Sequence, residues 1–207
     1  MRPAMMMIGA ALLWALSFTN GCTAFKRWAY EGGSRDSWQH ADEVIRVLQI
    51  QPGARVADVG AGGGYFTFRL ANAVGASGTV YAVDIDRGMT DYLKERAAEE
   101  GYRNVDVVLA TPDDPQLPRD GIDLIFTCNT YHHFDKAPDY FAAAKLYLRA
   151  GGRVAIIDYK YDGFFARLFG HASEGNTIRE DMLAAGYRLE HEYSFLPRQN
   201  FLVFVKG

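Results

Sequence analysis

The sequence of 207 residues has few of the features that indicate a disulfide framework, a metal site or a nucleic-acid surface. It contains two cysteines, Cys22 and Cys128, from which no disulfide framework can be read. The net charge is −3 and both signs are scattered, so we expect no nucleic-acid partner. There is no internal repeat, low-complexity tract or second domain pattern. With 49% hydrophobic and 23% charged residues, the chain can bury one substantial core, and we expect a monomer with one globular domain.

Residues 1–21 differ from the rest of the chain because they contain a long uncharged, largely apolar run. About 15 such residues rise only ~23 Å as a helix, which is short for a ~30 Å hydrocarbon core, so a signal peptide fits better than a span. Cys22 resembles the acylated cysteine of a bacterial lipoprotein signal, which implies lipidation in the cell envelope. An uncleaved anchor or a mis-assigned start codon is the alternative. Basic residues after the run favour a cytoplasmic location instead: Lys26, Arg27 and Arg35.

The strongest local pattern runs from Val56 to Val74. A short apolar strand enters the turn Gly60-Ala61-Gly62-Gly63-Gly64, and apolar residues then recur at helical spacing. Glycines at such a turn allow a sharp reversal, a close approach to a ligand and close helix packing, while the N–H groups at the helix start face the ligand. Alone, the pattern is also compatible with a ligand-free connection.

An acidic residue at the end of the next predicted strand indicates a nucleoside site. The strand 79–83 ends in Asp84, which lies 24 residues after Gly60, where a βαβ unit places a carboxylate against ribose hydroxyls. A dinucleotide fingerprint requires Gly or Ala at position 65, and this chain has Tyr65. The spacing instead gives D-x-G-x-G-x-G, formed by Asp58 and three of the glycines. A nicotinamide oxidoreductase is therefore disfavoured.

With this motif the sequence resembles the class I methyltransferases that use S-adenosylmethionine. The resemblance covers roughly residues 38–207, after a linker over 22–37, and later motifs follow in order: Val83-Asp84, Asp113-Asp114, Asp123-Leu124-Ile125-Phe126 and Leu148-Arg149-Ala150-Gly151-Gly152-Arg153. An arsenic methyltransferase is disfavoured because only Cys128 lies in this region.

Strand patterns alternate with helix patterns along the chain, which predicts an α/β fold with a mostly parallel, doubly wound sheet. Strands are expected near 55–59, 79–84, 105–109, 122–128 and 153–158, and helices near 38–50, 64–74, 89–100 and 136–148. Thr177 and Glu180 form a capping-box pattern for a further helix, which Gly186 ends. Two closing strands over 187–194 and 201–206 match the antiparallel seventh strand of the Rossmann-like methyltransferase fold.

The resemblance also implies roles for individual residues in binding S-adenosyl-L-methionine. Asp58 would orient the glycine turn or hold the methionine amino group through water, Asp84 would accept from both ribose hydroxyls, and Ile85 would lie on the adenine. Asp113 or Asp114 would accept from the adenine amine, although flanking prolines make this loop atypical. The complete predicted set is Asp58, Gly60, Ala61, Gly62, Gly64, Tyr65, Asp84, Ile85, Asp113, Asp114 and Asn129.

Asn129-Thr130-Tyr131-His132-His133-Phe134 follows the fourth strand and places polar groups at the expected cleft. We expect no metal, since no further ligands occur at a suitable spacing. The resemblance implies that the His pair shapes the pocket near the sulfonium, and either imidazole could act as a base. Methyl transfer needs mainly an in-line acceptor, so no catalytic residue is assigned. The candidates are His132, His133, Asp158 and Tyr159.

Two segments are candidates for covering the ligand. Residues 35–39 resemble a segment that closes over the cofactor in one bacterial group of these enzymes, while Trp38 could equally pack its helix onto the sheet. Residues 159–169, rich in aromatic side chains, could cover an apolar acceptor, enter a bilayer or form a packed connection. The sequence thus predicts a methyltransferase acting on an unidentified small or lipid-like acceptor. The alternative is a catalytically silent S-adenosylmethionine-binding module in the cell envelope, since an exported domain would be separated from the cytosolic cofactor.

Overall fold

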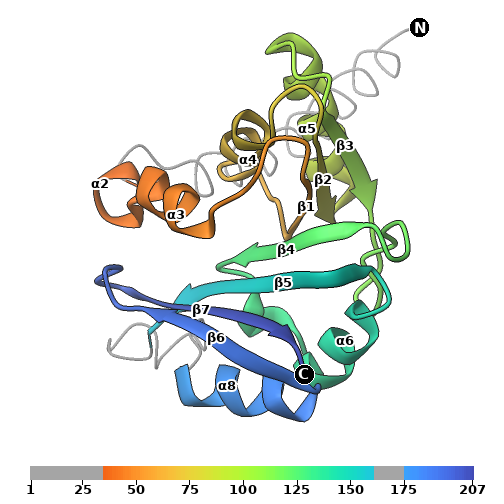
Figure 1. The fold of residues 1–207 in the computed structure, drawn as a ribbon. Helices are drawn as coiled ribbons and strands as arrows, with labels where there is room; N and C mark the ends of the chain where they lie inside the picture. Colours follow the sequence, from red (N-terminus) through yellow and green to blue (C-terminus); the bar gives the residue numbers. More distant parts are fainter. Residues whose placement is uncertain (1–34, 161–174) are drawn as a thin grey trace, which may run out of the picture.

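A seven-stranded sheet organises the computed structural model, which describes residues 35–160 and 175–207 (Figure 1). The strand order is β3-β2-β1-β4-β5-β7-β6. Neighbouring strands from β3 to β5 are parallel, whereas β7 is antiparallel to both β5 and β6. The fold prediction is confirmed. The strands are β1 (Arg55–Val59), β2 (Thr79–Asp84), β3 (Val105–Leu109), β4 (Ile122–Cys128), β5 (Leu148–Tyr159), β6 (Tyr187–Tyr193) and β7 (Gln199–Lys206).

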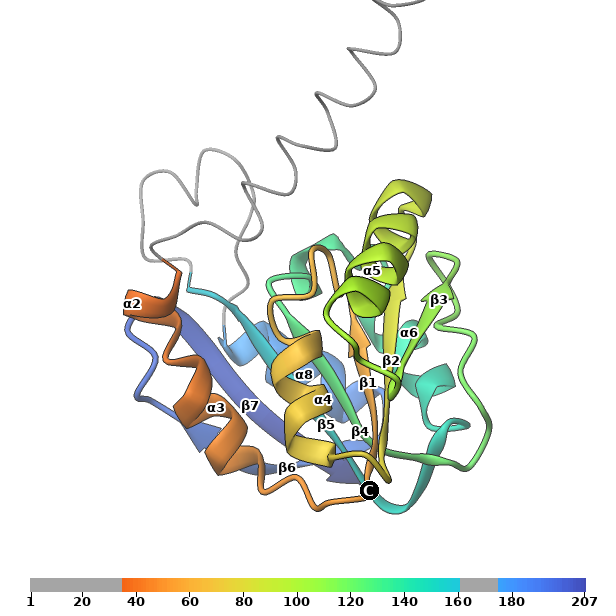
Figure 2. The same ribbon diagram turned by 90° about the horizontal axis from the view of Figure 1, so that it is seen from above.

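Helices cover both faces of the sheet. Figure 2 shows α3, α4 and α5 along one face, and Figure 1 shows α6 and α8 on the other. The helices are α2 (Asp36–Gln39), α3 (Ala41–Leu48), α4 (Thr67–Val74), α5 (Arg87–Glu99), α6 (Ala137–Ala144) and α8 (Gly175–Ala184), with a 3₁₀ turn, η1 (Tyr131–His133).

The two faces of the sheet form separate apolar cores because successive strand residues point in opposite directions. Ile157 and Phe126 pack with α3 and α4 on one side. Ile156 and Phe204 pack with α6 and α8 on the other. Each fully buried side chain of this size contributes about 1.5–3 kcal/mol. The central strands are buried on both faces, which explains their almost continuous apolar sequences.

The first four strands have the predicted bounds, but the helices differ from the expectation. α5 spans Arg87–Glu99 rather than 89–100, and α6 ends at Ala144 rather than near residue 148. The helix predicted over 38–50 is divided into α2 and α3 at His40, which has a φ of 48°. The helix predicted to begin at residue 64 begins at Thr67, because the glycine turn continues further along the chain. Side-chain periodicity does not reveal either break, since the apolar face continues through it.

Further differences concern the C-terminal half, where β6 ends at Tyr193 rather than at residue 194 and β7 begins at Gln199 rather than at residue 201. β5 begins at Leu148 rather than residue 153, and its register shifts opposite β4 between Ile122 and Leu124. The predicted cap at Thr177 is wrong, because α8 already begins at Gly175. Gly186 ends this helix as predicted, with a φ of 76° and its N–H donating to the carbonyl of Leu183 at 2.8 Å.

Several predictions lie outside the described residues. These are the signal peptide, the acylation of Cys22 and the aromatic segment after Lys160. Within residues 35–160 and 175–207, no helix combines the length and apolarity that a membrane crossing requires.

Candidate functional site

A cavity of about 810 Å³ lies at the carboxyl ends of the parallel strands. Its wall comes from the ends of β1, β2, β4 and β5, the segment after β3, the glycine turn, η1 and α2. The chain reverses its direction of sheet growth between β1 and β4, and ligands of open α/β sheets bind at such a switch point. The fold therefore places the cavity where a ligand is expected.

The glycines of the turn have distinct spatial roles. A Cβ on Gly60 would lie 2.2 Å from Oγ1 of Thr130, so only glycine fits against that side chain. The N–H of Gly62 donates to Oδ2 of Asp84 at 2.9 Å. Gly64 does not line the cavity; its φ is 89° and a Cβ there would lie 2.5 Å from the ring of Phe68. This glycine allows the turn to pack closely against α4.

The turn and the end of β2 are joined through the Asp84 carboxylate. Oδ2 accepts from Gly62, and Oδ1 accepts from the N–H of Asp86 at 2.9 Å. An ionised carboxylate has about four acceptor positions, so these two bonds fix its orientation without exhausting its capacity. Ile85 also lines the cavity, with 61% of its surface exposed. A carboxylate and an apolar side chain are therefore presented together.

Asp58 is a buried acid in the cavity wall. Its Oδ2 accepts from Oγ1 of Thr67 at 2.7 Å, which links the end of β1 to the first residue of α4. Burial raises the pKa of Asp58 to about 6; the Thr67 hydrogen bond and the charge of Arg35 act in the opposite direction, and the charge of Asp84 adds to the rise. The group can thus carry a negative charge at neutral pH, at an energetic cost.

The structure does not bring the predicted acids after β3 to the cavity. The O–H of Tyr147, directly before β5, donates to Oδ1 of Asp114 at 2.6 Å and holds that carboxylate. Neither Asp113 nor Asp114 contributes to the lining. At this edge the wall consists of Ala110, Thr111 and Pro112.

The polar segment after β4 meets the end of β5. Nδ1 of His132 lies 2.8 Å from Oδ1 of Asp158, and the backbone N–H of His132 donates to Oδ2 at 3.1 Å. The rings of His132 and His133 have centroids 4.1 Å apart. Both histidines and Tyr159 line the cavity, whereas Asp158 does not. In the described part of the chain, no group of three or more His, Cys, Asp or Glu residues could hold a metal ion.

A buried network of amide side chains, which the sequence did not reveal, positions Asn129. Nε of Arg35 donates to Gln39 at 3.1 Å, Nε2 of Gln39 donates to Gln199 at 2.6 Å, and Nε2 of Gln199 donates to Oδ1 of Asn129 at 2.5 Å. Both glutamines are fully buried. The thiol of Cys128 is beside this network, 3.6 Å from Nε2 of Gln39. The distance of 160 residues between the glutamines explains why no local pattern indicates the pair.

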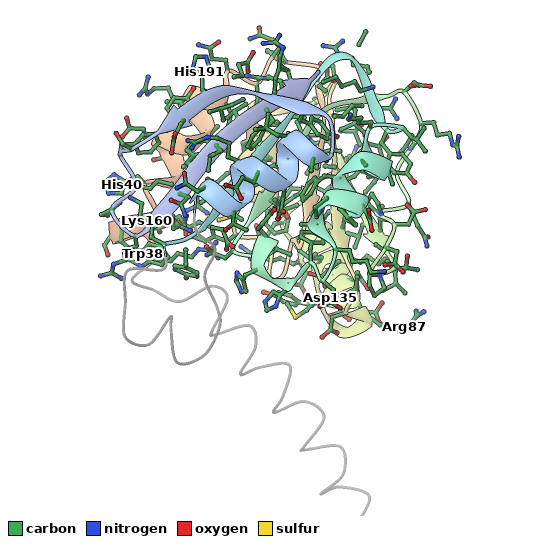
Figure 3. All side chains as sticks on the ribbon, turned by 90° about the horizontal axis from the view of Figure 1, so that it is seen from below. Trp38, His40, Arg87, Asp135, Lys160 and His191 are labelled. Carbon is green, nitrogen blue, oxygen red and sulfur yellow. The ribbon has the colours of Figure 1, made fainter. Side chains whose placement is uncertain are left out.

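Residues 35–39 both line the cavity and pack against it. Arg35 is stacked on the ring of Tyr65 at 3.9 Å, and the O–H of Tyr65 donates to Asp36 at 2.6 Å. Trp38 lines the cavity and contacts Tyr159, with ring centroids 5.9 Å apart. Figure 3 shows Trp38 at the same edge of the molecule as Lys160, which follows β5. Trp38 can therefore pack its helix against the sheet and also form part of the cavity wall.

Comparisons with known proteins agree with this geometry. Residues 56–152 match a family model described as a methyltransferase domain. The chain is 32% identical over 112 residues to aklanonic acid methyltransferase of Streptomyces sp. (strain C5), covering 54% of this chain and 51% of that protein. It is 26% identical over 133 residues to a ubiquinone/menaquinone biosynthesis C-methyltransferase of Ectopseudomonas mendocina, covering 64% and 51%. The chain thus spans about half the length of these curated relatives.

A solved S-adenosylmethionine-dependent methyltransferase from Aquifex aeolicus has the same fold, with a TM-score of 0.81 and 23% identity over 86% of this chain and 96% of that one. The chain therefore has the Rossmann-like fold of methyltransferases, and its residues 56–152 resemble a methyltransferase domain. The matched range contains the glycine turn, Asp84 and His132, whereas α2 and Asp158 lie outside it.

Proposed function

We propose that this protein transfers a methyl group from S-adenosyl-L-methionine to a small organic acceptor. The observation that carries the proposal is the arrangement around Asp84. Its carboxylate is held by the backbone of Gly62 and Asp86, beside a bare glycine turn, in the wall of a cavity of about 810 Å³. A carboxylate in this position suits the two hydroxyls of a ribose.

The other wall residues suit the remaining parts of the cofactor. Ile85 offers an apolar surface to adenine. Arg35 is the only Lys or Arg side chain in the lining that the structure describes, and we assign it to the cofactor carboxylate. Asp58, ionised at neutral pH, would pair with the ammonium group. When bound, the cofactor supplies an electrophilic methyl group on a sulfonium.

The acceptor side of the cavity favours a flat or apolar molecule. Trp38, Phe134, Tyr140 and Tyr159 line the cavity, as do the two histidines, and we assign these side chains to the acceptor. Aromatic side chains of this kind bind planar ligands by offset or edge contacts worth about 0.5–1.5 kcal/mol each beyond area burial. The curated relatives are named for aklanonic acid and for ubiquinone/menaquinone biosynthesis, which agrees with an aromatic or lipid-like acceptor.

Calorimetry with S-adenosylhomocysteine tests the cofactor site. Asp84→Ala should weaken binding by about tenfold to a hundredfold, because a hydrogen bond to a charged group contributes about 1.5–3 kcal/mol. Asp106→Asn, an exposed carboxylate on β3 away from the cavity lining, serves as the matched control and should bind like the parent. Equal affinity of Asp84→Ala and the parent, or tighter binding of NAD than of S-adenosylhomocysteine, would contradict the proposal.

We also propose that residues 1–21 act as a signal peptide and that Cys22 is acylated, which would place the domain in the cell envelope. The support is the sequence pattern alone. Metabolic labelling with a fatty-acid probe should mark the parent protein and not Cys22→Ala. Labelling of neither protein, with both recovered in the cytoplasmic fraction, would refute this location.

A further inference from the structure

The strongest unassigned feature of the cavity is the pair formed by His132 and Asp158. The carboxylate is fully buried and contacts both the ring Nδ1 at 2.8 Å and the backbone N–H of His132 at 3.1 Å. Burying a carboxylate is expensive unless it is paired and hydrogen-bonded. The imidazole lines the cavity and the carboxylate does not. The pair thus consists of a ring that faces the ligand space and an acid that contacts it from the protein side.

This arrangement suits the tautomer of His132 in which Nδ1 carries the proton and donates it to Asp158. An imidazole whose Nδ1–H donates to a carboxylate carries its acceptor lone pair on Nε2. The same carboxylate stabilises the imidazolium that forms when Nε2 takes a proton, as in other histidine–carboxylate pairs. The second bond, from the backbone N–H, holds the carboxylate in place during that change. The two contacts with Asp158 therefore fix the orientation of the ring.

The charged and titratable surroundings of the pair come from three elements. η1 contributes His133, whose ring is 4.1 Å from that of His132. Asp158 also raises the pKa of Tyr131 in η1, of Cys128 in β4 and of Tyr159 in β5, although burial is the larger cause in each case. Two cations act on this set: Arg35 lowers the pKa of Cys128 and of Tyr159, and Arg198 lowers the pKa of Tyr159.

We propose that His132, positioned by Asp158, is the general base that deprotonates a hydroxyl on an aromatic acceptor, so that the protein is an O-methyltransferase of phenol-type molecules. The inference rests on the proposed function. The acceptor oxygen forms a bond to the methyl carbon as the sulfur–methyl bond breaks, and that electron pair stays on sulfur as a neutral thioether. The hydroxyl proton passes to Nε2 of His132 and then to water. Charge and atoms balance without another reactant.

The acceptor class follows from the chemistry of the wall. Methyl transfer to a group that already has an available lone pair, such as a neutral amine or a thiolate, needs no base. A phenol is mostly protonated at neutral pH and must lose its proton to react well. Trp38, Phe134 and Tyr159 line the same cavity as the two imidazoles and offer aromatic surface to a planar acceptor. A buried base and an aromatic wall together favour a hydroxyaromatic acceptor.

A series of phenols of graded acidity tests the base directly. For weakly acidic members, His132→Gln should lower kcat by about a hundredfold to a thousandfold, in the range of general base catalysis. For members that are ionised at the assay pH, such as a dinitrophenol, the loss should shrink to less than about threefold, since no proton remains to be removed. A structural role of His132 would lower the rate equally across the series, and that result would overturn the proposal. So would failure of the parent to methylate any member.

A second measurement needs no turnover. 4-Nitrophenol is titrated spectroscopically in protein saturated with S-adenosylhomocysteine, where the phenolate band should appear at lower pH in the parent than in His132→Gln. Asp158→Asn should behave like His132→Gln. Tyr131→Phe is the matched control in the same turn: it removes the 2.6 Å bond to Asp181 outside the cavity lining, and the band should stay at the parent pH. An unchanged band in His132→Gln would overturn the inference.

The two proposals fail separately. If S-adenosylhomocysteine does not bind the parent in calorimetry, the proposed function is wrong. If it binds the parent and His132→Gln alike, but the acidity series and the phenolate band do not distinguish them, only the role of His132 is wrong.

Discussion

Asp58→Asn is expected to make the protein more stable and a weaker binder of cofactor. Asp58 is buried in the cavity wall and accepts from the hydroxyl of Thr67 at 2.7 Å. Asparagine has nearly the same shape and keeps an acceptor oxygen for this hydroxyl. The substitution therefore removes the charge and leaves the local hydrogen bond in place.

The magnitude follows from the pKa of the group. Burial raises the pKa of Asp58 from 3.8 to about 6, with smaller opposing effects from Thr67 and Arg35. Because one pKa unit corresponds to about 1.4 kcal/mol, ionising this buried acid costs about 3 kcal/mol of folding free energy at pH 7. A gain of this size corresponds to a rise in Tm of about 6–12 °C for a domain of this length.

The sign of the pH dependence is fixed by the direction of the pKa change. The folded state binds the proton more tightly than the unfolded chain, so the contribution of Asp58 is fully present below pH 3.8 and is lost as the pH rises to about 6. The Asn variant lacks this titration. The difference in unfolding free energy between the two proteins should thus grow between pH 4 and 6 and stay constant above it.

Urea unfolding of both proteins at several pH values measures this difference. Asp106→Asn, an exposed carboxylate, is the control and should change stability by less than about 0.5 kcal/mol. Affinity for S-adenosylmethionine should fall about tenfold in Asp58→Asn, since the ammonium group loses an ionised partner. A variant less stable than the parent at pH 7 would refute this reasoning, as would a difference in unfolding free energy that does not vary with pH. Either result would show that ionising the buried Asp58 carboxyl does not cost folding free energy.

Three further substitutions or modifications test other parts of the structure. Gly64→Ala should cost about 2–4 kcal/mol, because alanine is strained at a φ of 89° and its Cβ would lie 2.5 Å from the ring of Phe68; an unchanged Tm would contradict this packing. Gln39→Leu should cost about 1–3 kcal/mol in urea unfolding, since it leaves the buried Oε1 of Gln199 without the donor Nε2 of Gln39, and a neutral effect would argue against the amide network. Burial raises the pKa of Cys128 to about 12, so its thiol should remain unmodified by iodoacetamide at pH 8 until urea is added. Mass spectrometry detects the modification, and rapid labelling of Cys128 in the native protein would show that its thiol is accessible.

Much of the fold could be predicted because its signals are local. The strand bounds of β1, β2 and β4 follow from the apolar runs of buried parallel strands, and those of the edge strand β3 from its short valine-rich run. Gly60 marks the turn because glycine tolerates its positive φ and its close contact with Thr130. The position of Asp84 relative to this turn is fixed by the length of one βαβ unit. These features depend on neighbours within about 30 residues along the chain.

Predictions were weaker where the deciding contact is distant in sequence. Asp113 and Asp114 occupy the expected position after β3, but Tyr147 holds Asp114 away from the cavity. The cap at Thr177 failed because helix α8 begins two residues earlier, at Gly175. In both cases the local pattern permitted more than one arrangement.

The sequence by itself determined the order of strands and helices, the glycine turn and the carboxylate that follows it. Only the tertiary structure decided that Gln39 meets Gln199, that Trp38 meets Tyr159, and that His132 lies against a fully buried Asp158. The physical reason is that backbone conformation and apolar periodicity are encoded by adjacent residues. Hydrogen bonds between buried polar side chains instead depend on which strands the sheet places side by side.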